Sequence, residues 1–273
     1  MLPVPELPEV ETVARQLQPR LAGRKVHSLR ILDARLRNGR TPALRGRKIR
    51  GVRRSGKRVL IEFTAAPRHR DDLYLAVHLR MTGRLLWVPE HAPRRTSHLR
   101  ARFELDRGTL LFVDTRRFGT FEWFRSDTEA APTGVDPLES GFTPRRLDEL
   151  VLGVRQNAKA WLMRQDKLVG LGNIYASEIL HAARVSPLRE IASLTSVERR
   201  ALHRSIRRIL SRAIENCGTT FSDFQDARGV SGSYQSLLAV YGRERLRCGR
   251  CGGTIRRIVQ QQRSTFFCPA CQR

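Results

Sequence analysis

Hydrophobic residues recur at helical spacing almost from the start of the chain. Within residues 8–21 they fall every three or four positions, and Pro8 lies where the first turn of a helix tolerates proline. Short apolar runs follow, separated by turn sequences such as Ser55-Gly56 and Thr82-Gly83. These β-type runs cover 25–31, 48–53, 58–63, 73–79, 84–88, 98–105 and 109–113. The pattern predicts an antiparallel β-sandwich or barrel with one leading helix over residues 1–130.

The periodicity becomes helical after residues 131–140, a segment with the Pro, Thr and Gly that are typical of a linker. The expected helices cover 144–152, 158–165, 174–183 and 197–215. In the last of them apolar residues recur at every fourth position, and arginines occupy much of the remaining surface. We therefore expect a β domain at 1–130, a linker at 131–140, a helical domain at 141–238 and a Cys-rich domain at 239–273. The expected fold class is α+β, with two main domains.

Four of the five cysteines lie near the C-terminus at a spacing typical of metal ligands. Cys248 and Cys251 form one C-x2-C pair, Cys268 and Cys271 form another, and sixteen residues separate the two pairs. This spacing is typical of a zinc ribbon, in which a β-hairpin joins two thiolate pairs around a tetrahedral ion. Four protein ligands leave no position for a substrate, so we expect one structural Zn²⁺ and not a catalytic one. Cys217 stands apart and is expected to be an inert, small apolar residue.

The charge balance changes the expected partner from a small neutral metabolite to a polyanion. The 273 residues include 51 Lys and Arg against 26 Asp and Glu, a formal net charge of +25. Only five of these basic residues are lysines, and such an arginine excess can also follow from codon composition. Codon composition does not explain the scarcity of carboxylates, so the net charge still indicates a polyanion. No apolar run approaches the ~18 residues of a membrane helix, and we expect a cytoplasmic protein without a membrane partner.

The pair Pro5-Glu6, just before the first helix, combines a candidate nucleophile with a candidate proton carrier. A proline at the N-terminus of a chain has a secondary amine, which forms an iminium with an aldehyde-type carbon much as lysine forms a Schiff base. A neighbouring carboxylate moves the accompanying proton. The alternative is that proline and glutamate only favour the start of a helix.

Three further motifs separate these alternatives. They are His78-Leu79-Arg80-Met81-Thr82-Gly83, Arg116-Arg117-Phe118-Gly119 after Asp114, and Gly170-Leu171-Gly172-Asn173-Ile174-Tyr175-Ala176-Ser177-Glu178. Together with PELPEVE at residues 5–11 and the zinc ribbon, they closely resemble the bacterial formamidopyrimidine-DNA glycosylases, also called 8-oxoguanine DNA glycosylases, over the whole chain and in the same order. The resemblance implies an N-terminal β-sandwich with a leading helix, then a helix-two-turns-helix bundle and a zinc-ribbon β-hairpin.

The resemblance also implies an activity, the bifunctional base-excision repair of damaged double-stranded DNA. The family removes oxidised purines, 8-oxoguanine and formamidopyrimidines, and then cleaves the strand by β- and δ-elimination. Its N-terminal proline corresponds to Pro5 and attacks deoxyribose C1′ to form a Schiff base, while Glu6 corresponds to the residue that serves as acid and base. Lys57 on a hairpin turn and Arg263 in the zinc hairpin match the remaining catalytic positions. We expect a lesion-covering loop within 226–234, and a monomer that needs no nucleotide cofactor.

Residues that match the family's DNA contacts occur in both halves of the chain. They are Met81, Arg116, Phe118, Lys159, Asn173 and Arg263, and less closely His98 and Arg155. An enzyme that acts on a base must extrude it from the duplex, and the first three side chains correspond to those that fill the gap it leaves. Asn173 and Arg263 resemble the family's phosphate clamp, to which Lys159 adds a matching phosphate contact.

Two departures from the family pattern bear on this interpretation. Arg80 stands where the family commonly has glycine, and Thr115 where it has proline, which affects the loops of Met81 and its partners. Residues 1–4 precede Pro5, and a proline nitrogen inside a peptide bond is not nucleophilic. Our hypothesis is that translation starts at the codon of Val4, because a GUG triplet can also initiate with methionine, which is then removed before proline.

Two alternatives stay open at this point. An endonuclease VIII-type glycosylase shares the proline chemistry and the zinc ribbon but prefers oxidised pyrimidines. PELPEVE, Met81 and the Arg116–Gly119 stretch favour the purine type. A non-catalytic zinc-ribbon DNA-binding protein is the second alternative, and it applies if Pro5 is not the mature N-terminus.

Overall fold

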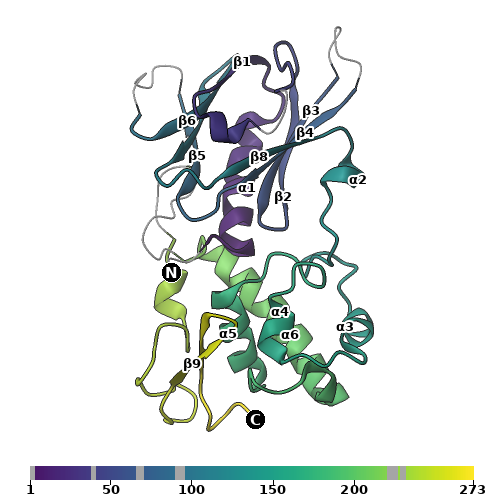
Figure 1. Cartoon of the computed structure of the whole chain (residues 1–273), viewed down its shortest axis with the longest axis vertical. Coiled ribbons are helices and arrows are strands. Elements are labelled where there is room, and N and C mark those ends of the chain that lie inside the picture. The colour runs from purple at the N-terminus through teal and green to yellow at the C-terminus, as the bar shows by residue number, and fades with distance from the viewer. Residues whose placement is uncertain (1–3, 38–40, 66–70, 90–95, 220–226, 228–231) are drawn as a thin grey trace. The chain divides into compact units, whose positions relative to one another are not determined.

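The computed structural model describes residues 4–37, 41–65, 71–89, 96–219, 227 and 232–273, which form two compact units (Figure 1). The first unit comprises the chain up to residue 131 together with 216–233, and the second comprises 132–215 together with 234–273. The domain limits expected from the sequence stay a prediction. The two units are not divided at these limits: residues after 215 return to the first unit before the chain enters the second unit again, and 132–140 and 239–273 belong to the same unit as the helices.

Two four-stranded antiparallel sheets and a leading helix, α1 (Leu7–Leu21), build the first unit. The strands are β1 (Val26–Ile31), β2 (Ile49–Ser55), β3 (Arg58–Phe63), β4 (Leu73–His78), β5 (Gly83–Val88), β6 (Leu99–Leu105), β7 (Thr109–Asp114) and β8 (Thr120–Phe124). One sheet has the order β1-β6-β7-β5 and the other β2-β3-β4-β8. Helix α1 packs on β2, β3 and β5, and two short helices, η1 (Ala34–Leu36) and α2 (Asp127–Ala130), complete the unit. The predicted sandwich with a leading helix is confirmed.

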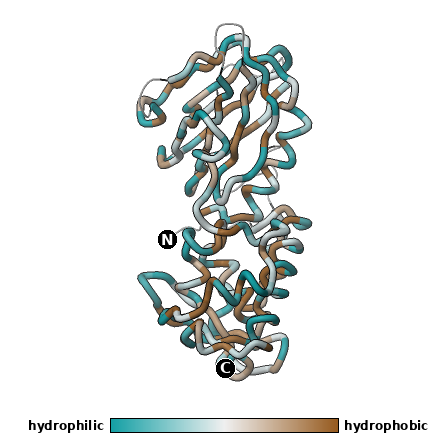
Figure 2. The backbone as a smooth tube through the Cα atoms, turned by 90° about the vertical axis from the view of Figure 1, so that its right-hand side faces the viewer, coloured by the Kyte–Doolittle hydropathy of each residue, from teal (hydrophilic) through white to brown (hydrophobic). Residues whose placement is uncertain are grey.

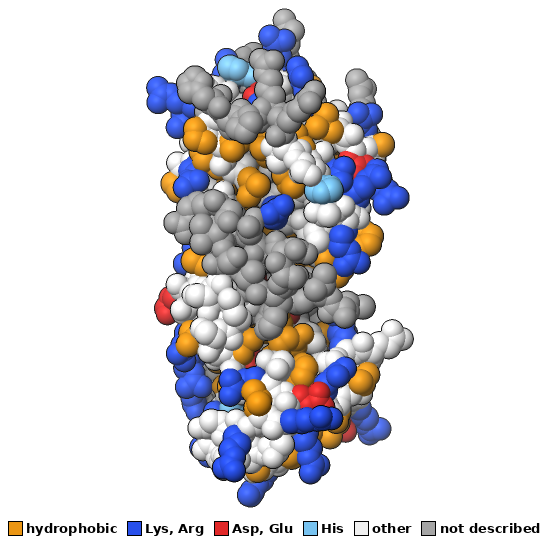
Figure 3. All heavy atoms as spheres, turned by 90° about the vertical axis from the view of Figure 1, so that its left-hand side faces the viewer, with side chains coloured by type: hydrophobic (Ala, Val, Ile, Leu, Met, Phe, Trp, Pro, Cys, Tyr) orange, Lys and Arg blue, Asp and Glu red, His pale blue; other side chains and the backbone are white. Residues whose placement is uncertain are grey.

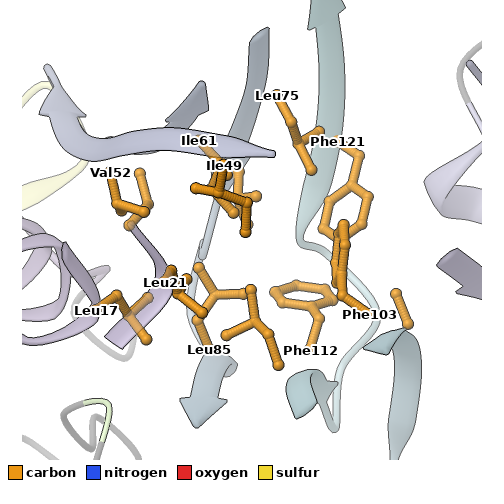
Figure 4. Packing of buried hydrophobic residues seen from close by; sticks show 14 of the residues in the cluster. Leu17, Leu21, Ile49, Val52, Ile61, Leu75, Leu85, Phe103, Phe112 and Phe121 are labelled. Atoms are coloured by element: carbon orange, nitrogen blue, oxygen red, sulfur yellow. The ribbon is translucent and has the colours of Figure 1, made fainter. Parts of the chain in front are cut away.

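A hydrophobic core fills the space between α1 and the two sheets (Figure 4). Leu17 and Leu21 of α1 and Val52 of β2 line one end of this core, and each is at most 5% exposed. Phe112 and Phe121 pack in the other part, with ring centroids 5.1 Å apart. Hydrophobic residues recur along the strands and the connecting loops are largely hydrophilic (Figure 2), as expected for sheets with one buried face.

Helices and a small hairpin build the second unit. Its elements are α3 (Pro144–Val151), α4 (Ala158–Leu162), α5 (Asn173–Ala183), η2 (Ile191–Ser193), α6 (Ser196–Glu215), η3 (Tyr234–Leu237), β9 (Arg256–Gln260) and β10 (Arg263–Phe267). Leu202, Ile206 and Leu210 of α6 are fully buried, as their spacing predicts, and α6 packs on α5. Strand β10 also packs on α5, so this helix lies between α6 and the hairpin. Among the described residues, no helix is both long and apolar enough to cross a membrane.

Candidate functional site

The start of α1 is fixed by a buried carboxylate. Pro5 is buried immediately before the helix, and Glu6, which is 3% exposed, is its N-cap residue. The Glu6 backbone N–H donates to Glu9 Oε2 at 2.9 Å. The other oxygen, Glu9 Oε1, accepts from the backbone N–H of Thr219 at 2.7 Å and from its hydroxyl at 3.0 Å. Glu9 therefore holds Pro5 and Glu6 against the segment that returns to the first unit.

Lys57 lies in the two-residue turn between β2 and β3, after Gly56, whose φ is +61°. Glycine takes this left-handed φ without strain, as the first position of a type II′ turn requires. Burial, together with the nearby positive charges of Arg80, Lys57 and Arg58, lowers the pKa of His78 to about 3. The backbone N–H of Arg80 donates to Nδ1 of the neutral imidazole at 3.1 Å. Lys57 is therefore close to the turn that follows β4.

The buried carboxylate of Asp114 joins two loops of the first unit. Asp114 is 1% exposed, and its Oδ1 accepts from the Thr82 hydroxyl, in the loop of Met81. The backbone N–H groups of the second loop also donate to it, from Arg116 to Oδ1 at 3.2 Å and from Gly119 to Oδ2 at 2.8 Å. The Arg116 N–H is shared with the Thr82 hydroxyl at 3.0 Å. Asp114 thus sets the positions of both loops that carry the expected gap-filling residues.

These two loops present apolar and cationic side chains to solvent. Met81 is half-buried, Arg116 is exposed, and Phe118 is 47% exposed. The Arg116 guanidinium lies over the Phe118 ring, 4.9 Å from its centroid. Arg117, which lies between these two residues in the sequence, forms a bidentate ion pair with Asp33 instead. Its Nε donates to Asp33 Oδ2 at 2.6 Å and its Nη2 donates to Asp33 Oδ1 at 2.8 Å. Met81, Arg116 and Phe118 therefore present a flexible apolar side chain, a planar donor and an aromatic ring at the surface of the first unit.

In the second unit, Asn173 is the first residue of α5. Its amide Nδ2 donates to the Tyr241 hydroxyl at 3.4 Å, and its Oδ1 is buried without a hydrogen-bond partner among the described residues. The dipole at the start of a helix favours an anion. Tyr241 was not expected from the sequence, because nothing in its local pattern relates it to a residue 68 positions earlier.

Lys159 of α4 is only 1% exposed, so it lies inside the second unit and not on its surface. Its ammonium donates to the Ser264 carbonyl at 3.1 Å and to the Thr265 hydroxyl at 2.6 Å, both on β10. Arg263, which begins β10, is exposed. Lys159 therefore anchors the strand that presents Arg263.

The two less closely matching residues lie on the surface, one in each unit. His98 is exposed just before β6, with a left-handed φ of +59°, and its carbonyl accepts the Asp114 N–H at 3.0 Å. Arg155 is exposed between α3 and α4. Most of the expected lesion-covering loop, 226–234, lies outside the described residues.

The four cysteines form one cluster at the base of the β9–β10 hairpin, and their sulfur atoms all lie within 4.8 Å of one another. Cys248 Sγ is 3.9 Å from Cys271 Sγ, and Cys251 Sγ is 3.5 Å from Cys268 Sγ. A tetrahedron with Zn–S bonds of ~2.3 Å has edges of about 3.8 Å, so the cluster fits one Zn²⁺ closed by four thiolates. His181 of α5 places its Nε2 3.4 Å from Cys248 Sγ.

Sequence reasoning missed the carboxylates that position the site. Glu9 had a usable signal, because a Glu three residues after an N-cap residue is the spacing of a capping box. Asp114 had a weaker one, since it ends a strand just before the Arg116–Gly119 stretch. Their partners Thr82 and Thr219 come from other parts of the chain, and nothing in the sequence relates either threonine to its carboxylate.

Three family models match the chain in succession. The formamidopyrimidine-DNA glycosylase N-terminal domain matches residues 4–121, the formamidopyrimidine-DNA glycosylase H2TH domain matches 133–225, and the zinc finger found in FPG and IleRS matches 245–273. The formamidopyrimidine-DNA glycosylase of Symbiobacterium thermophilum is 42% identical over 280 residues, covering 98% of this chain and 89% of the relative. That of Laribacter hongkongensis is 41% identical over 279 residues, covering 99% and 100%.

Solved structures agree along the full length. The Lactococcus lactis Fpg (MutM) protein in complex with DNA that contains an oxidised pyrimidine is similar, with 34% identity and a TM-score of 0.86 over 98% of this chain and 100% of that chain. The MutM (Fpg) protein of Thermus thermophilus has 38% identity and a TM-score of 0.85 over 98% of both chains.

Proposed function

Because the chain belongs to the formamidopyrimidine-DNA glycosylase family, we propose that it removes oxidised purines, 8-oxoguanine and formamidopyrimidines, from duplex DNA and then cleaves the strand. The observation that carries the proposal is the buried Pro5-Glu6 pair at the start of α1, which Glu9 holds in one place. Fixed geometry of this kind favours a reaction in which a nucleophile and an acid–base group act on one carbon atom.

Once its nitrogen is free, Pro5 attacks deoxyribose C1′, and the new C–N bond replaces the glycosidic bond to the damaged base. Glu6 carries the proton during base loss and sugar-ring opening. The iminium that results makes the neighbouring sugar protons acidic, so β-elimination and then δ-elimination release the two phosphates. Lys57, in the turn after β2, supplies a cation beside this chemistry.

The remaining residues handle the DNA. Met81, Arg116 and Phe118 fill the stack after base extrusion, and Asn173 and Arg263 bind phosphates. The depth of Lys159 supports a positioning role, in which it fixes β10 so that Arg263 reaches the backbone. Surface-exposed His98 and Arg155 add further contacts to the DNA, one from each unit.

The structural Zn²⁺ holds the β9–β10 hairpin in shape and takes no part in the chemistry. We further propose that the protein acts as a monomer, without a nucleotide cofactor, at the nucleoid in the cytoplasm.

Borohydride trapping on duplex DNA with 8-oxoguanine opposite cytosine tests the proposal. A chain that begins at Pro5 should form a covalent adduct, and the same chain with Glu6→Gln should excise the base far more slowly. Tight binding without any adduct would instead favour a non-catalytic DNA-binding protein. A parallel duplex with thymine glycol separates the endonuclease VIII type, which would prefer that substrate.

The intact mass of natively expressed protein tests the start of the chain. A mature chain that begins at Pro5 is expected, because only then is the proline nitrogen an amine. Residues 1–4 retained on active enzyme would contradict this part of the proposal.

A further inference from the structure

A pocket of about 470 Å³ lies within the second unit, and none of the residues proposed above to bind DNA lines it. Four arginines line this arginine pocket: Arg208 and Arg212 of α6, Arg243 after η3, and Arg250 between two of the zinc ligands. His181 and Ala182, at the end of α5, form part of its wall. The pocket therefore gathers guanidinium groups from three separate segments of the chain.

The pocket has little negative charge to compensate these groups. Glu178 is the one acidic residue in its lining, and it is 2% exposed. Its carboxylate already accepts the backbone N–H groups of Ala239, Val240 and Tyr241 at 2.8, 2.9 and 2.8 Å. Even if fully ionised, it offsets one of the four positive charges, so the pocket keeps a formal excess of three. A concave surface with such an excess concentrates anions.

Two of the guanidinium groups, those of Arg208 and Arg243, form no ion pair within the described residues, although Arg243 lies near enough to Glu178 to interact with its charge. The Nε of Arg243 is buried without an acceptor among these residues. Arg250, in contrast, is held in place, because it donates to the His181 carbonyl at 2.6 Å. A buried N–H without an acceptor is costly, and an oxyanion in the pocket that Arg243 lines would place an acceptor beside this guanidinium group.

We propose that the arginine pocket is a phosphate-binding site separate from the clamp of Asn173 and Arg263. Guanidinium groups match the oxygens of a phosphate with paired N–H donors, and several of them converge here. Asn173 begins α5 and His181 lies eight residues later, about 12 Å along the helix axis. One phosphate group cannot reach both sites. The group comes either from a free phosphorylated molecule or from the DNA backbone, which share this chemistry.

Titration calorimetry with inorganic phosphate, at constant ionic strength, tests the site. Arg208 is exposed on α6, so Arg208→Glu should leave the fold intact and weaken phosphate binding about tenfold or more. Arg200→Glu makes the same charge change on the same helix, about 12 Å away and outside the pocket, and should alter binding less than twofold. Equal affinities for wild type and Arg208→Glu, or no saturable binding by wild type, would overturn the proposal.

A second readout observes the pocket directly. The ¹⁵N resonance of the Arg243 Nε–H, assigned by its loss in Arg243→Lys, should shift as phosphate is added. A resonance that stays unchanged at saturation would contradict the site. Repeating the titration on the complex with undamaged duplex DNA identifies the source of the phosphate group. If inorganic phosphate still binds to the complex, the ligand is a free phosphorylated molecule. If the duplex excludes inorganic phosphate, and Arg208→Glu binds the duplex more weakly than Arg200→Glu does, the ligand is the DNA backbone.

Discussion

At the scale of single residues, buried carboxylates organise the candidate site of a strongly basic protein. Glu9 holds the start of α1 and Asp114 holds the two loops of Met81 and Arg116, and both do so mainly through backbone N–H donors. A carboxylate offers two acceptor oxygens and no donor, whereas the amide of Asn or Gln replaces one of these oxygens with an NH₂ donor. These two carboxylates therefore fix backbone segments that carry candidate site residues.

Replacing Asp114 with Asn tests this role. The NH₂ group of the Asn side chain would face one of the N–H or O–H groups that now donate a hydrogen bond to the carboxylate. We therefore expect the free energy of unfolding to fall by about 1–3 kcal/mol and excision to slow about tenfold. Asp106→Asn is the matched control, because Asp106 is exposed in the β6–β7 turn and its side chain accepts only from Arg107 N. Denaturation and single-turnover excision measure both effects. Equal losses in the two variants would argue against a specific role for Asp114.

The ion pair of Asp33 with Arg117 predicts a dependence of stability on pH. The hydrogen bond from Arg117 holds the pKa of Asp33 at about 2, below its ordinary value of 3.8. The folded state therefore favours the ionised form, so this stabilisation is complete above about pH 4 and is lost as pH falls toward 2. Urea denaturation between pH 6 and 2 should show about 1–2 kcal/mol of loss that is absent in Asp33→Asn. An unchanged pH profile in the variant would exclude the pair as its source.

At the scale of elements, the spacing of hydrophobic residues predicted most of the fold, because a helix or strand that buries one face repeats its hydrophobic residues at its own structural period. The spacing of α1 and α6 and the apolar runs of seven strands all correspond to elements of the structure. Strand β8 (Thr120–Phe124) was not among the expected runs, since a short strand after a loop offers few alternating positions. The return of Thr219 to α1 and the burial of Lys159 could not be predicted, because both depend on partners more than 100 residues away.

Gly218 tests the contact where the returning chain meets α1. Its φ is +75°, and a Cβ there would lie 2.6 Å from Glu9 Oε1. Glu9 is buried and bonded to Thr219, so it cannot move aside without breaking those hydrogen bonds. Gly218→Ala should therefore lower the free energy of unfolding by about 1–3 kcal/mol more than Gly23→Ala. Gly23 has a similar φ of +81° with nothing within 4 Å, so it measures the backbone strain alone.

His181 connects α5 to the zinc ribbon. A zinc-bound thiolate only accepts hydrogen bonds, so the His181 Nε2, 3.4 Å from Cys248 Sγ, must carry the proton. His181→Phe keeps the ring but removes the donor, and zinc transfer to a chromogenic chelator should become about tenfold faster. His203→Phe, at another buried histidine of this unit that pairs with the Phe142 carbonyl, should leave the rate unchanged. Equal acceleration in both variants would indicate general loosening of the unit.

At the scale of the whole molecule, the net charge of +25 is a property of the chain as a whole and does not locate a binding site. Lys and Arg side chains are spread over both units on the face shown in Figure 3. Many arginines are already paired with carboxylates, such as Arg54 with Glu11 and Arg199 with Asp148. The composition therefore predicts a polyanionic partner but does not identify the cations that touch it. We propose such a contact for Arg263 from its position, because it is exposed at the start of β10.

The salt dependence of DNA binding distinguishes these two kinds of cation. Each phosphate that the protein neutralises releases counterions, so log Kobs should fall linearly with log salt, with a slope of about −0.9 per contact. Arg263→Gln should reduce the steepness by about 1, because one contact is lost. Arg145→Gln removes an exposed arginine of α3 that is paired with Glu149 at 3.3 Å, and should leave the slope as it is. Equal changes in both variants would mean that the diffuse charge of the surface, and not a positioned clamp, holds the DNA.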